Sequence, residues 1–434
     1  MATVAGATPL HPGEAEAAAA LPGMRWRKLL PLGLMLPFFG QMFAYVKDLL
    51  PLWAISKAFP LLSLPFILFL VREGRPFAGR QVMLTFAWLV LVPSFIAIST
   101  FDQNFFRGLT AQVKLLPILY FFSFLGFLCW LRPSLSEITA TFLFWGALVF
   151  VAILLLWALA PQDWYGEHYV LGEAPTLSRD GRGNRIRMPM FFGSILAFYC
   201  FRRFAADKRP IWLVAVGIMM LLLTGIVRQR TIVVGWAAIL AINSIVLAGP
   251  WLRIGVAALT PAALWGLFQV PYVASVFDTT EASGFDVRRT STQLALETLG
   301  DDPLRWIFGV GTLSPLDPGA LMTWFNHFFF LADITWLGIV FEFGIVGAIL
   351  LLVLPLRALV LAWDVRRRFD TPFLAAVQDI LLYLILVSPL NPITLAPGEV
   401  TMLLAFLVYV RALIDRADED AGTAGHSPAR PIAA

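Results

Sequence analysis

Long runs of apolar residues alternate with short polar segments along most of the chain. A helix that crosses a membrane needs about 20 mostly apolar residues. Twelve stretches approach that length: 29–46, 54–71, 82–100, 114–131, 137–159, 188–201, 211–227, 231–248, 251–269, 333–356, 373–390 and 399–414. The second and the sixth are short or interrupted by proline. The pattern predicts an all-α polytopic membrane protein with about twelve transmembrane helices.

The composition excludes most other classes. The chain has 434 residues, of which 59% are hydrophobic and only 14% are charged, whereas a soluble domain carries about 25% charged residues. Even a large globular domain buries only about 75% of its surface, so one soluble core cannot hide this much apolar area. With 37 Phe and two Cys, a disordered chain and a disulfide scaffold are excluded as well.

The spans divide the chain into five parts. These are an N-terminal tail (1–28), nine spans with an outer loop at 160–187 (29–269), a large outer loop (270–332), three further spans (333–414) and a polar C-terminal tail (415–434). A connection of some 60 residues is far longer than the 12–15 at which an unstructured loop becomes unusual. Helical spacing at 290–299 therefore predicts a small helical cap within it, and the tail is expected to be disordered.

Lysine and arginine positions set the expected orientation. With the N-terminus inside, most of the 32 basic residues fall in cytoplasmic segments, as the positive-inside rule requires. Both termini are then expected in the cytoplasm. The other arginines concentrate in three outer segments: Arg179, Arg182, Arg185 and Arg187; Arg228 and Arg230; and Arg288, Arg289 and Arg305. Since guanidinium groups bind phosphate bidentately, these clusters predict an anion site; the alternative is snorkelling or pairing with loop acids.

Few other residues are candidates for chemistry. His327 lies where the large loop re-enters the membrane and is placed to act as a general base; a structural histidine is the equal alternative. Asp379 and Glu342 fall inside spans, where acids are functional candidates by default, although either could simply bond a neighbouring helix. No metal-ligand spacing, phosphate-binding loop or dinucleotide fingerprint occurs on the outer side, so we expect no metal, cofactor or nucleic acid.

Three stretches in order resemble the superfamily of O-antigen ligases and O-antigen polymerases. They are Asn184-Arg-Ile-Arg-Met-Pro-Met190, Leu222-Leu-Thr-Gly-Ile-Val-Arg-Gln-Arg-Thr231, and a loop pattern of Asp286-Val-Arg288, Pro303, Phe308-Gly-Val-Gly311, Asn326-His327 and Gly338. The resemblance covers about residues 180–350. Two positions depart from the ligase signature, because Phe328 stands where a small polar residue is usual and Phe341 replaces a glycine. These departures weaken the choice of ligase over polymerase more than membership of the superfamily.

The resemblance implies a glycosyltransferase of the GT-C-like architecture in the inner membrane of a Gram-negative bacterium, with its active site in the periplasm. The donor would be a glycan on undecaprenyl pyrophosphate and the acceptor lipid A-core, so the primary interpretation is an O-antigen ligase working without metal or cofactor and with inversion. A repeat-unit polymerase is the runner-up. A flippase or proton-coupled transporter for anionic lipids is the alternative of another class, with Asp379 or Glu342 as its proton site.

The resemblance and the charge pattern together assign roles to residues. His327 is the expected catalytic base, and the expected pyrophosphate ligands are Arg185, Arg187, Arg228, Arg230 and Arg288. Secondary candidates are Arg182, Arg289, Asp333 and Asp379. We expect the arginine pairs at 185/187 and 228/230 to converge, and the large loop to move about Gly309-Val-Gly311.

Overall fold

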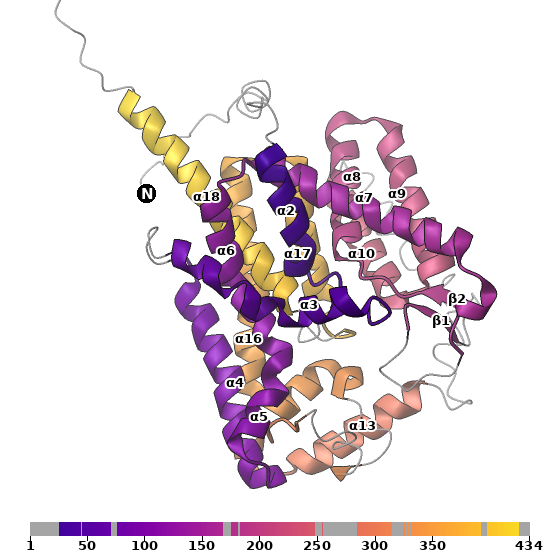
Figure 1. The fold of residues 1–434 in the computed structure, drawn as a ribbon, viewed down its shortest axis with the longest axis vertical. Coiled ribbons are helices and arrows are strands. Elements are labelled where there is room, and N and C mark those ends of the chain that lie inside the picture. Colours follow the sequence, from indigo (N-terminus) through magenta and orange to yellow (C-terminus); the bar gives the residue numbers. More distant parts are fainter. Residues whose placement is uncertain are drawn as a thin grey trace, which may run out of the picture.

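The computed structural model describes residues 26–44, 46–70, 76–167, 175–180, 183–247, 254, 284–314, 324–325, 329, 331–391 and 397–424. These residues are mostly helical (Figure 1). In chain order the helices are α2 (Trp26–Phe39), α3 (Leu50–Leu62), η1 (Leu64–Phe69), α4 (Gly79–Phe101), α5 (Phe105–Ala111), η2 (Gln112–Leu119), α6 (Tyr120–Leu131), α7 (Leu135–Leu159), η3 (Gln162–Trp164), α8 (Phe191–Asp207), α9 (Pro210–Leu222), η4 (Leu223–Val227), α10 (Arg230–Leu247), α13 (Gly284–Leu299), α14 (Pro303–Phe308), η5 (Leu331–Ile334), α16 (Thr335–Arg368), α17 (Pro372–Val387) and α18 (Pro397–Ala424).

The helices have the length and composition of membrane spans. Within the described residues, eight helical segments are long and apolar enough to cross a membrane: Leu50–Phe69, Gly79–Phe101, Phe105–Leu131, Leu135–Leu159, Pro210–Val227, Arg230–Leu247, Leu331–Arg368 and Pro397–Glu419. Helix α17 is apolar but shorter. An all-α polytopic membrane protein is thus confirmed. The expected ninth span, 251–269, lies outside the described residues.

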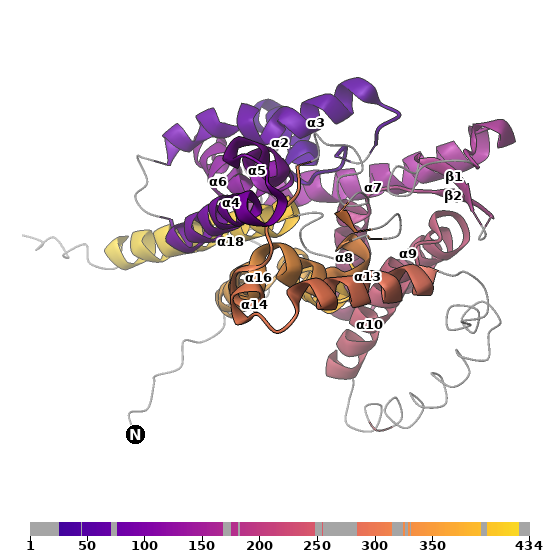
Figure 2. The same cartoon turned by 90° about the horizontal axis from the view of Figure 1, so that it is seen from below.

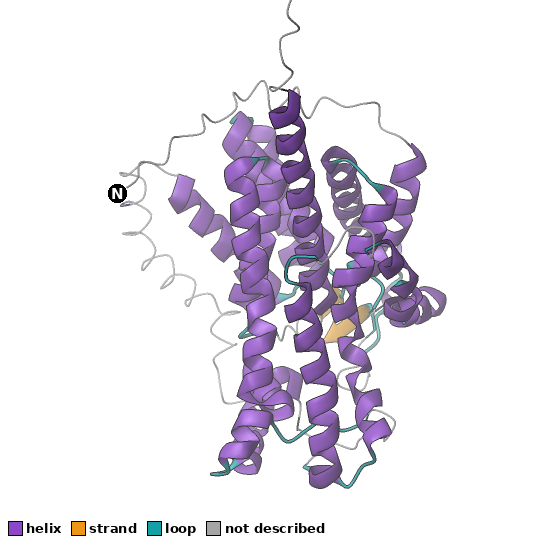
Figure 3. Ribbon diagram, turned by 90° about the vertical axis from the view of Figure 1, so that its left-hand side faces the viewer, coloured by secondary structure: helices purple, strands orange, loops and turns teal. Residues whose placement is uncertain are grey.

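The main core lies where α6, α7, α8, α16, α17 and α18 pack side by side (Figures 1 and 3). The most apolar stretch of α18 packs within this bundle and is 72% buried. The most apolar stretch of α7 is only 28% buried, although α7 is the more hydrophobic of the two helices, with a mean hydropathy of 2.6 against 1.6. Apolar side chains that face outward are expected for a helix whose other side meets lipid.

Helix α16 is broken at Gly344, and the break receives a segment of the large loop. Gly344 has φ 69° and ψ 175°, and a Cβ there would lie 2.1 Å from the Ile307 carbonyl oxygen. Helix α14 therefore packs directly on the break. The Phe341 carbonyl accepts a hydrogen bond from the Val310 amide at 2.7 Å, so the loop replaces a bond that the helix loses.

A second, smaller core joins the large loop to the bundle. It contains Ala97 and Phe101 of α4, Ala295 and Leu299 of α13, Val310, Phe329, Ile334 of η5 and Phe341 of α16. In the view from below, α13 and α14 lie against the beginning of α16 (Figure 2). The helix expected at 290–299 is confirmed and begins earlier, at Gly284. The described part of the loop contains α13 and α14, both of which pack against α16.

Two features differ from the sequence-based expectation. The outer loop 160–187 contains an antiparallel hairpin of β1 (Leu177–Asp180) and β2 (Gly183–Ile186), because four-residue strands are too short to show a reliable alternating pattern. The C-terminal tail was expected to be disordered from about 415, but α18 continues to Ala424. Good helix formers and an ion pair between Arg411 and Asp415, four residues apart, favour that extension.

Candidate functional site

The β1–β2 hairpin has one apolar face and one basic face. Ile186 is fully buried in the main core, and its partner in the ladder is Leu177. Side chains alternate along a strand, so Gly183 and Arg185 lie on the other face. Arg185 is only 5% exposed. A guanidinium is thus fixed on the hairpin rather than left to move in solvent.

Arg187 continues this basic face. Its amide donates to the Thr176 carbonyl at 2.7 Å, which extends the ladder by one pair beyond the strand. Its Nε donates to Ser178 Oγ at 3.0 Å, and Ser178 is the ladder partner of Arg185. Directly paired residues share a face, so Ser178, Arg185 and Arg187 stand on the same side of the hairpin.

Arg228 reaches this face from a distant part of the chain. It ends the π-helical turn η4 in a left-handed conformation, with φ 54°, and its Nε donates to the Gly225 carbonyl at 2.8 Å. A Cβ on Gly183 would lie 2.7 Å from Arg228 Nη1, so the basic face of β2 points at this guanidinium. We call Arg185, Arg187 and Arg228 the arginine face.

Neighbouring loops hold the hairpin in place. The Thr176 amide donates to Asp48 Oδ2 at 2.9 Å, and Asn184 Nδ2 donates to Gln162 Oε1. On the opposite face, Arg179 pairs with Glu167 at 2.7 Å, with both side chains more than half exposed. Guanidiniums bind phosphate oxygens bidentately, so three of them on one face of the hairpin have the chemistry to bind a pyrophosphate.

The other expected arginines lie elsewhere or outside the described residues. Arg230 is the first residue of α10, two positions after Arg228. Arg288 and Arg289 are exposed on α13, a helix that packs against η5, where Asp333 lies. The structure therefore brings together three of the five proposed pyrophosphate ligands and places Arg288 at the junction of α13 and η5. Arg182, His168 and His327 lie outside the described residues.

The proposed hinge is clamped between two helices. Gly309 and Gly311 have φ values of 82° and 90°. A Cβ on Gly309 would lie 2.7 Å from the Glu342 carbonyl, and one on Gly311 would lie 2.7 Å from backbone atoms of α4. The following Thr312 carbonyl accepts from Gln103 Nε2 at 2.7 Å. This segment is a buried wedge, which is a poor site for a hinge, so any opening of the cap must use other residues.

An ion pair lies beside the break in α16. Lys114 Nζ lies 2.7 Å from both carboxylate oxygens of Glu342 and 5.6 Å from the Phe343 ring centroid. The Glu342 side chain is 10% exposed and that of Lys114 is 41% exposed. The sequence indicated Glu342 but missed Lys114, for which the only signal was one cation within an otherwise apolar stretch.

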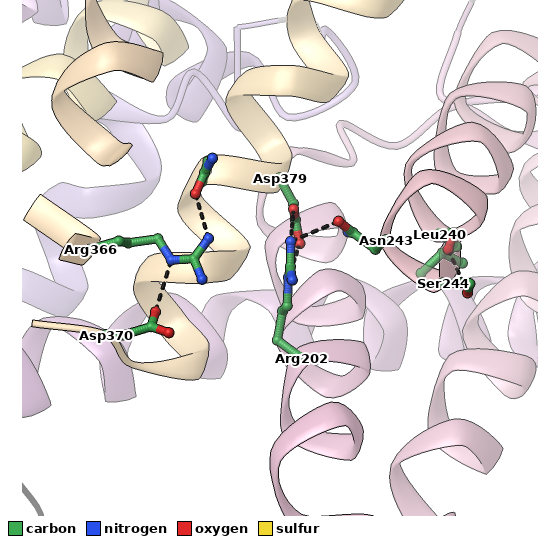
Figure 4. A network of polar contacts seen from close by, with 8 residues as sticks. Arg202, Leu240, Asn243, Ser244, Arg366, Asp370 and Asp379 are labelled. Carbon is green, nitrogen blue, oxygen red and sulfur yellow. Dashed lines mark hydrogen bonds and ion pairs between the residues drawn. The ribbon is translucent and has the colours of Figure 1, made fainter. Parts of the chain in front are cut away.

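Asp379 belongs to a buried polar network that ties three helices together (Figure 4). Arg202 of α8 binds both oxygens of Asp379 on α17, at 2.7 and 2.6 Å. The same guanidinium donates to Asn243 Oδ1 of α10 at 2.7 Å. These residues lie toward the ends of α8 and α10 that are far from the hairpin. The arrangement favours the structural interpretation of Asp379, a bond to a neighbouring helix.

No family model matches the chain, and no curated protein matches it. Among the described residues, no group of three or more His, Cys, Asp or Glu side chains is placed to hold a metal ion.

Proposed function

We propose that the protein is a glycosyltransferase that moves a glycan from undecaprenyl pyrophosphate to lipid A-core at the periplasmic face of a Gram-negative inner membrane. The arginine face is the observation that carries the proposal. Arg185, Arg187 and Arg228 are fixed by the hairpin, Ser178 and η4 at one end of an apolar helical bundle. A pyrophosphate attached to a lipid needs both features: guanidiniums for its phosphates and apolar helices for its tail.

The reaction is a single displacement. An acceptor hydroxyl oxygen attacks the anomeric carbon, the bond from that carbon to the pyrophosphate oxygen breaks, and undecaprenyl pyrophosphate leaves with the bonding electrons. The proton of the hydroxyl passes to a base, for which His327 is the candidate from the sequence. Negative charge grows on the leaving pyrophosphate, where fixed guanidiniums stabilise it most. One displacement inverts the anomeric centre.

The direct test uses purified protein, lipid-linked glycan and lipid A-core, with no nucleotide and no added metal. Transfer of the glycan to lipid A-core is the expected result. Lengthening of the donor glycan when lipid A-core is omitted would instead identify the repeat-unit polymerase of the same superfamily. No transfer to either acceptor by folded protein that binds the donor would overturn the proposal.

The role of the arginine face has its own test. Arg185→Lys keeps the charge but loses the guanidinium fork, and hydrogen bonds to charged groups contribute about 1.5–3 kcal/mol. We expect the KM for the donor to rise at least about tenfold. Arg179→Lys is the matched control, since Arg179 lies on the same hairpin but pairs with Glu167 on the opposite face. If the two variants change the KM for the donor equally, Arg185 is not part of the binding site.

One observation supports a second candidate, a transporter of anionic lipids. Glu342 and Lys114 form their ion pair next to the break at Gly344, and transporters place their binding sites at broken helices. In that case movement of an anionic lipid between the leaflets of a proteoliposome would depend on a proton gradient and on Glu342. Glycan transfer that is insensitive to a proton gradient favours the glycosyltransferase.

A further inference from the structure

Two cavities lie side by side where α4, α6, α16 and α18 come together. The first, of about 440 Å³, is lined by Arg132, Arg411 and Arg416 together with apolar residues of α6 and α18. The second, of about 590 Å³, is lined by Arg80 and Arg357 together with apolar residues of α4 and α6. Following the chain through successive helices places both cavities at the end of the bundle away from the arginine face. We call them the paired cavities.

Phe77 joins the paired cavities. Its ring lines the first cavity, and the preceding residue, Pro76, lines both. The Arg411 guanidinium lies 5.5 Å from the Phe77 ring centroid, and the Arg357 guanidinium lies 6.0 Å from it. One arginine from each cavity therefore contacts the same aromatic ring, and anions bound to the two would be close neighbours.

The linings carry an excess of positive charge. Among the described residues that line them, Asp415 is the one acid, and its carboxylate is bound by Arg368 at 2.7 Å. Arg411 forms ion pairs with Asp364 at 3.7 Å and with Asp415 at 3.8 Å. The described residues that line the two cavities thus include five arginines and one aspartate, so the linings carry net positive charge.

Exposed aromatic residues place this end at the surface of a membrane. Trp130 of α6 and Trp363 of α16 are 48% and 50% exposed, and the Arg367 guanidinium stacks over the Trp363 ring at 3.5 Å. Tryptophan is enriched at the level of the lipid headgroups. The cavities also have apolar walls, including Leu125 and Val408, against which acyl chains can pack.

We propose that the paired cavities bind the headgroup of a phospholipid with two phosphates, diphosphatidylglycerol, with one phosphate in each cavity. Basic pockets between transmembrane helices are suited to such headgroups. Two cavities on either side of one ring match two phosphates joined by a short bridge better than they match a single phosphate. The site is separate from the proposed transferase site and does not depend on it.

Native mass spectrometry of the delipidated full-length protein tests the proposal. It is titrated with diphosphatidylglycerol, phosphatidylglycerol and phosphatidylethanolamine in turn. We expect diphosphatidylglycerol to bind most tightly. Arg357→Gln and Arg411→Gln should each weaken its binding about fivefold, because one basic residue near a membrane surface contributes about 1 kcal/mol. Arg80→Gln should do the same, and since Arg80 is exposed, its loss is compatible with folding.

Arg203→Gln is the matched control. Arg203 lies at the same end of the bundle, on α8, but pairs with Asp207 at 2.7 Å outside both cavities. Its loss should leave lipid binding unchanged. The site would be overturned if phosphatidylethanolamine bound as tightly as diphosphatidylglycerol, or if Arg203→Gln weakened lipid binding as much as the cavity variants do. Phosphatidylglycerol that binds as tightly, with the same dependence on Arg357 and Arg411, would overturn the two-phosphate headgroup.

Discussion

At the scale of single residues, the arginine face depends on the absence of a side chain at Gly183. Its φ of 82° lies in the left-handed region, and a Cβ there would collide with Arg228 Nη1. Glycine is thus favoured at position 183 both by the backbone conformation and by the close approach of Arg228. A small residue in a short loop thus controls how closely η4 approaches the hairpin.

Gly183→Ala should therefore displace Arg228 from the hairpin. The left-handed conformation costs a residue with a Cβ about 1–2 kcal/mol, so we expect a modest loss of stability and a clear rise in the KM for the donor. Thermal unfolding and donor titration measure the two effects. Gly217→Ala is the control, since a Cβ at Gly217 meets nothing within 4 Å. Unchanged donor affinity in Gly183→Ala would argue against a role of Arg228 in binding.

His327→Ala tests the proposed base. Loss of a general base typically lowers the rate about 10²–10⁴-fold, and a histidine at a loop junction is not expected to be needed for folding. The variant should express normally, bind the lipid-linked donor and transfer almost no glycan. His168→Ala, compared at matched protein level, should retain most activity. Near-normal transfer by His327→Ala would leave Asp333 as the next candidate.

At the scale of elements, the break in α16 couples the cap to the bundle. Gly344 admits α14, Val310 bonds the carbonyl that the break leaves without a helical partner, and the wedge at 309–314 fills the space between α4 and α16. Contacts of this kind link the cap firmly to α16. The Lys114–Glu342 pair lies at the same level and is the polar part of this junction.

Removing either partner of that pair should have unequal effects. Lys114→Met leaves a carboxylate that is 10% exposed without its cation, whereas Glu342→Gln leaves an ammonium that is 41% exposed and can reach solvent. Breaking a buried pair costs about 3–5 kcal/mol, and we expect a loss near the lower end for Lys114→Met and less than half of it for Glu342→Gln. Thermal unfolding in detergent measures both. Equal losses of stability in Lys114→Met and Glu342→Gln would contradict this expectation.

At the scale of the whole molecule, the orientation in the membrane decides which face meets which substrates. The hairpin lies at one end of α8, and the other end of this helix is far from the hairpin (Figure 1). A label at each end of α8 therefore reports the orientation. Neither of the two cysteines, Cys129 and Cys200, forms a disulfide, and both can be replaced before such labels are introduced.

Single cysteines should give opposite labelling in intact cells. In a background without Cys129 and Cys200, Asp163→Cys lies exposed beside the hairpin, and Ala206→Cys lies exposed at the end of α8. A membrane-impermeant maleimide should modify Asp163→Cys in intact cells, and Ala206→Cys only after the cells are opened. The reverse pattern would place the arginine face in the cytoplasm and exclude a periplasmic transferase.

The sequence by itself determined where most of the helices lie, although not the β1–β2 hairpin. Eleven of the twelve apolar runs correspond to helices, or to consecutive helical segments, of the described chain, because the need to satisfy every backbone group in lipid makes a run of apolar residues helical wherever it lies. The last ten residues of the cap helix, 290–299, were also visible locally, from a cap and helical spacing. The clustering of arginines at 179–187, 228–230 and 288–305 was also readable, because it depends only on position along the chain.

Only the tertiary structure decided which side chains meet. Lys114 and Glu342 are 228 positions apart, and Arg202 and Asp379 are 177 apart, so no local pattern connects them. The wedge at Gly309 and Gly311 had the composition of a hinge, but two packed helices fix it. Arg228 reaches the hairpin because η4 ends in a left-handed turn and Gly183 leaves room for it. Such contacts are set by how helices pack, and packing depends on shape across the whole molecule rather than on hydrophobicity along the chain.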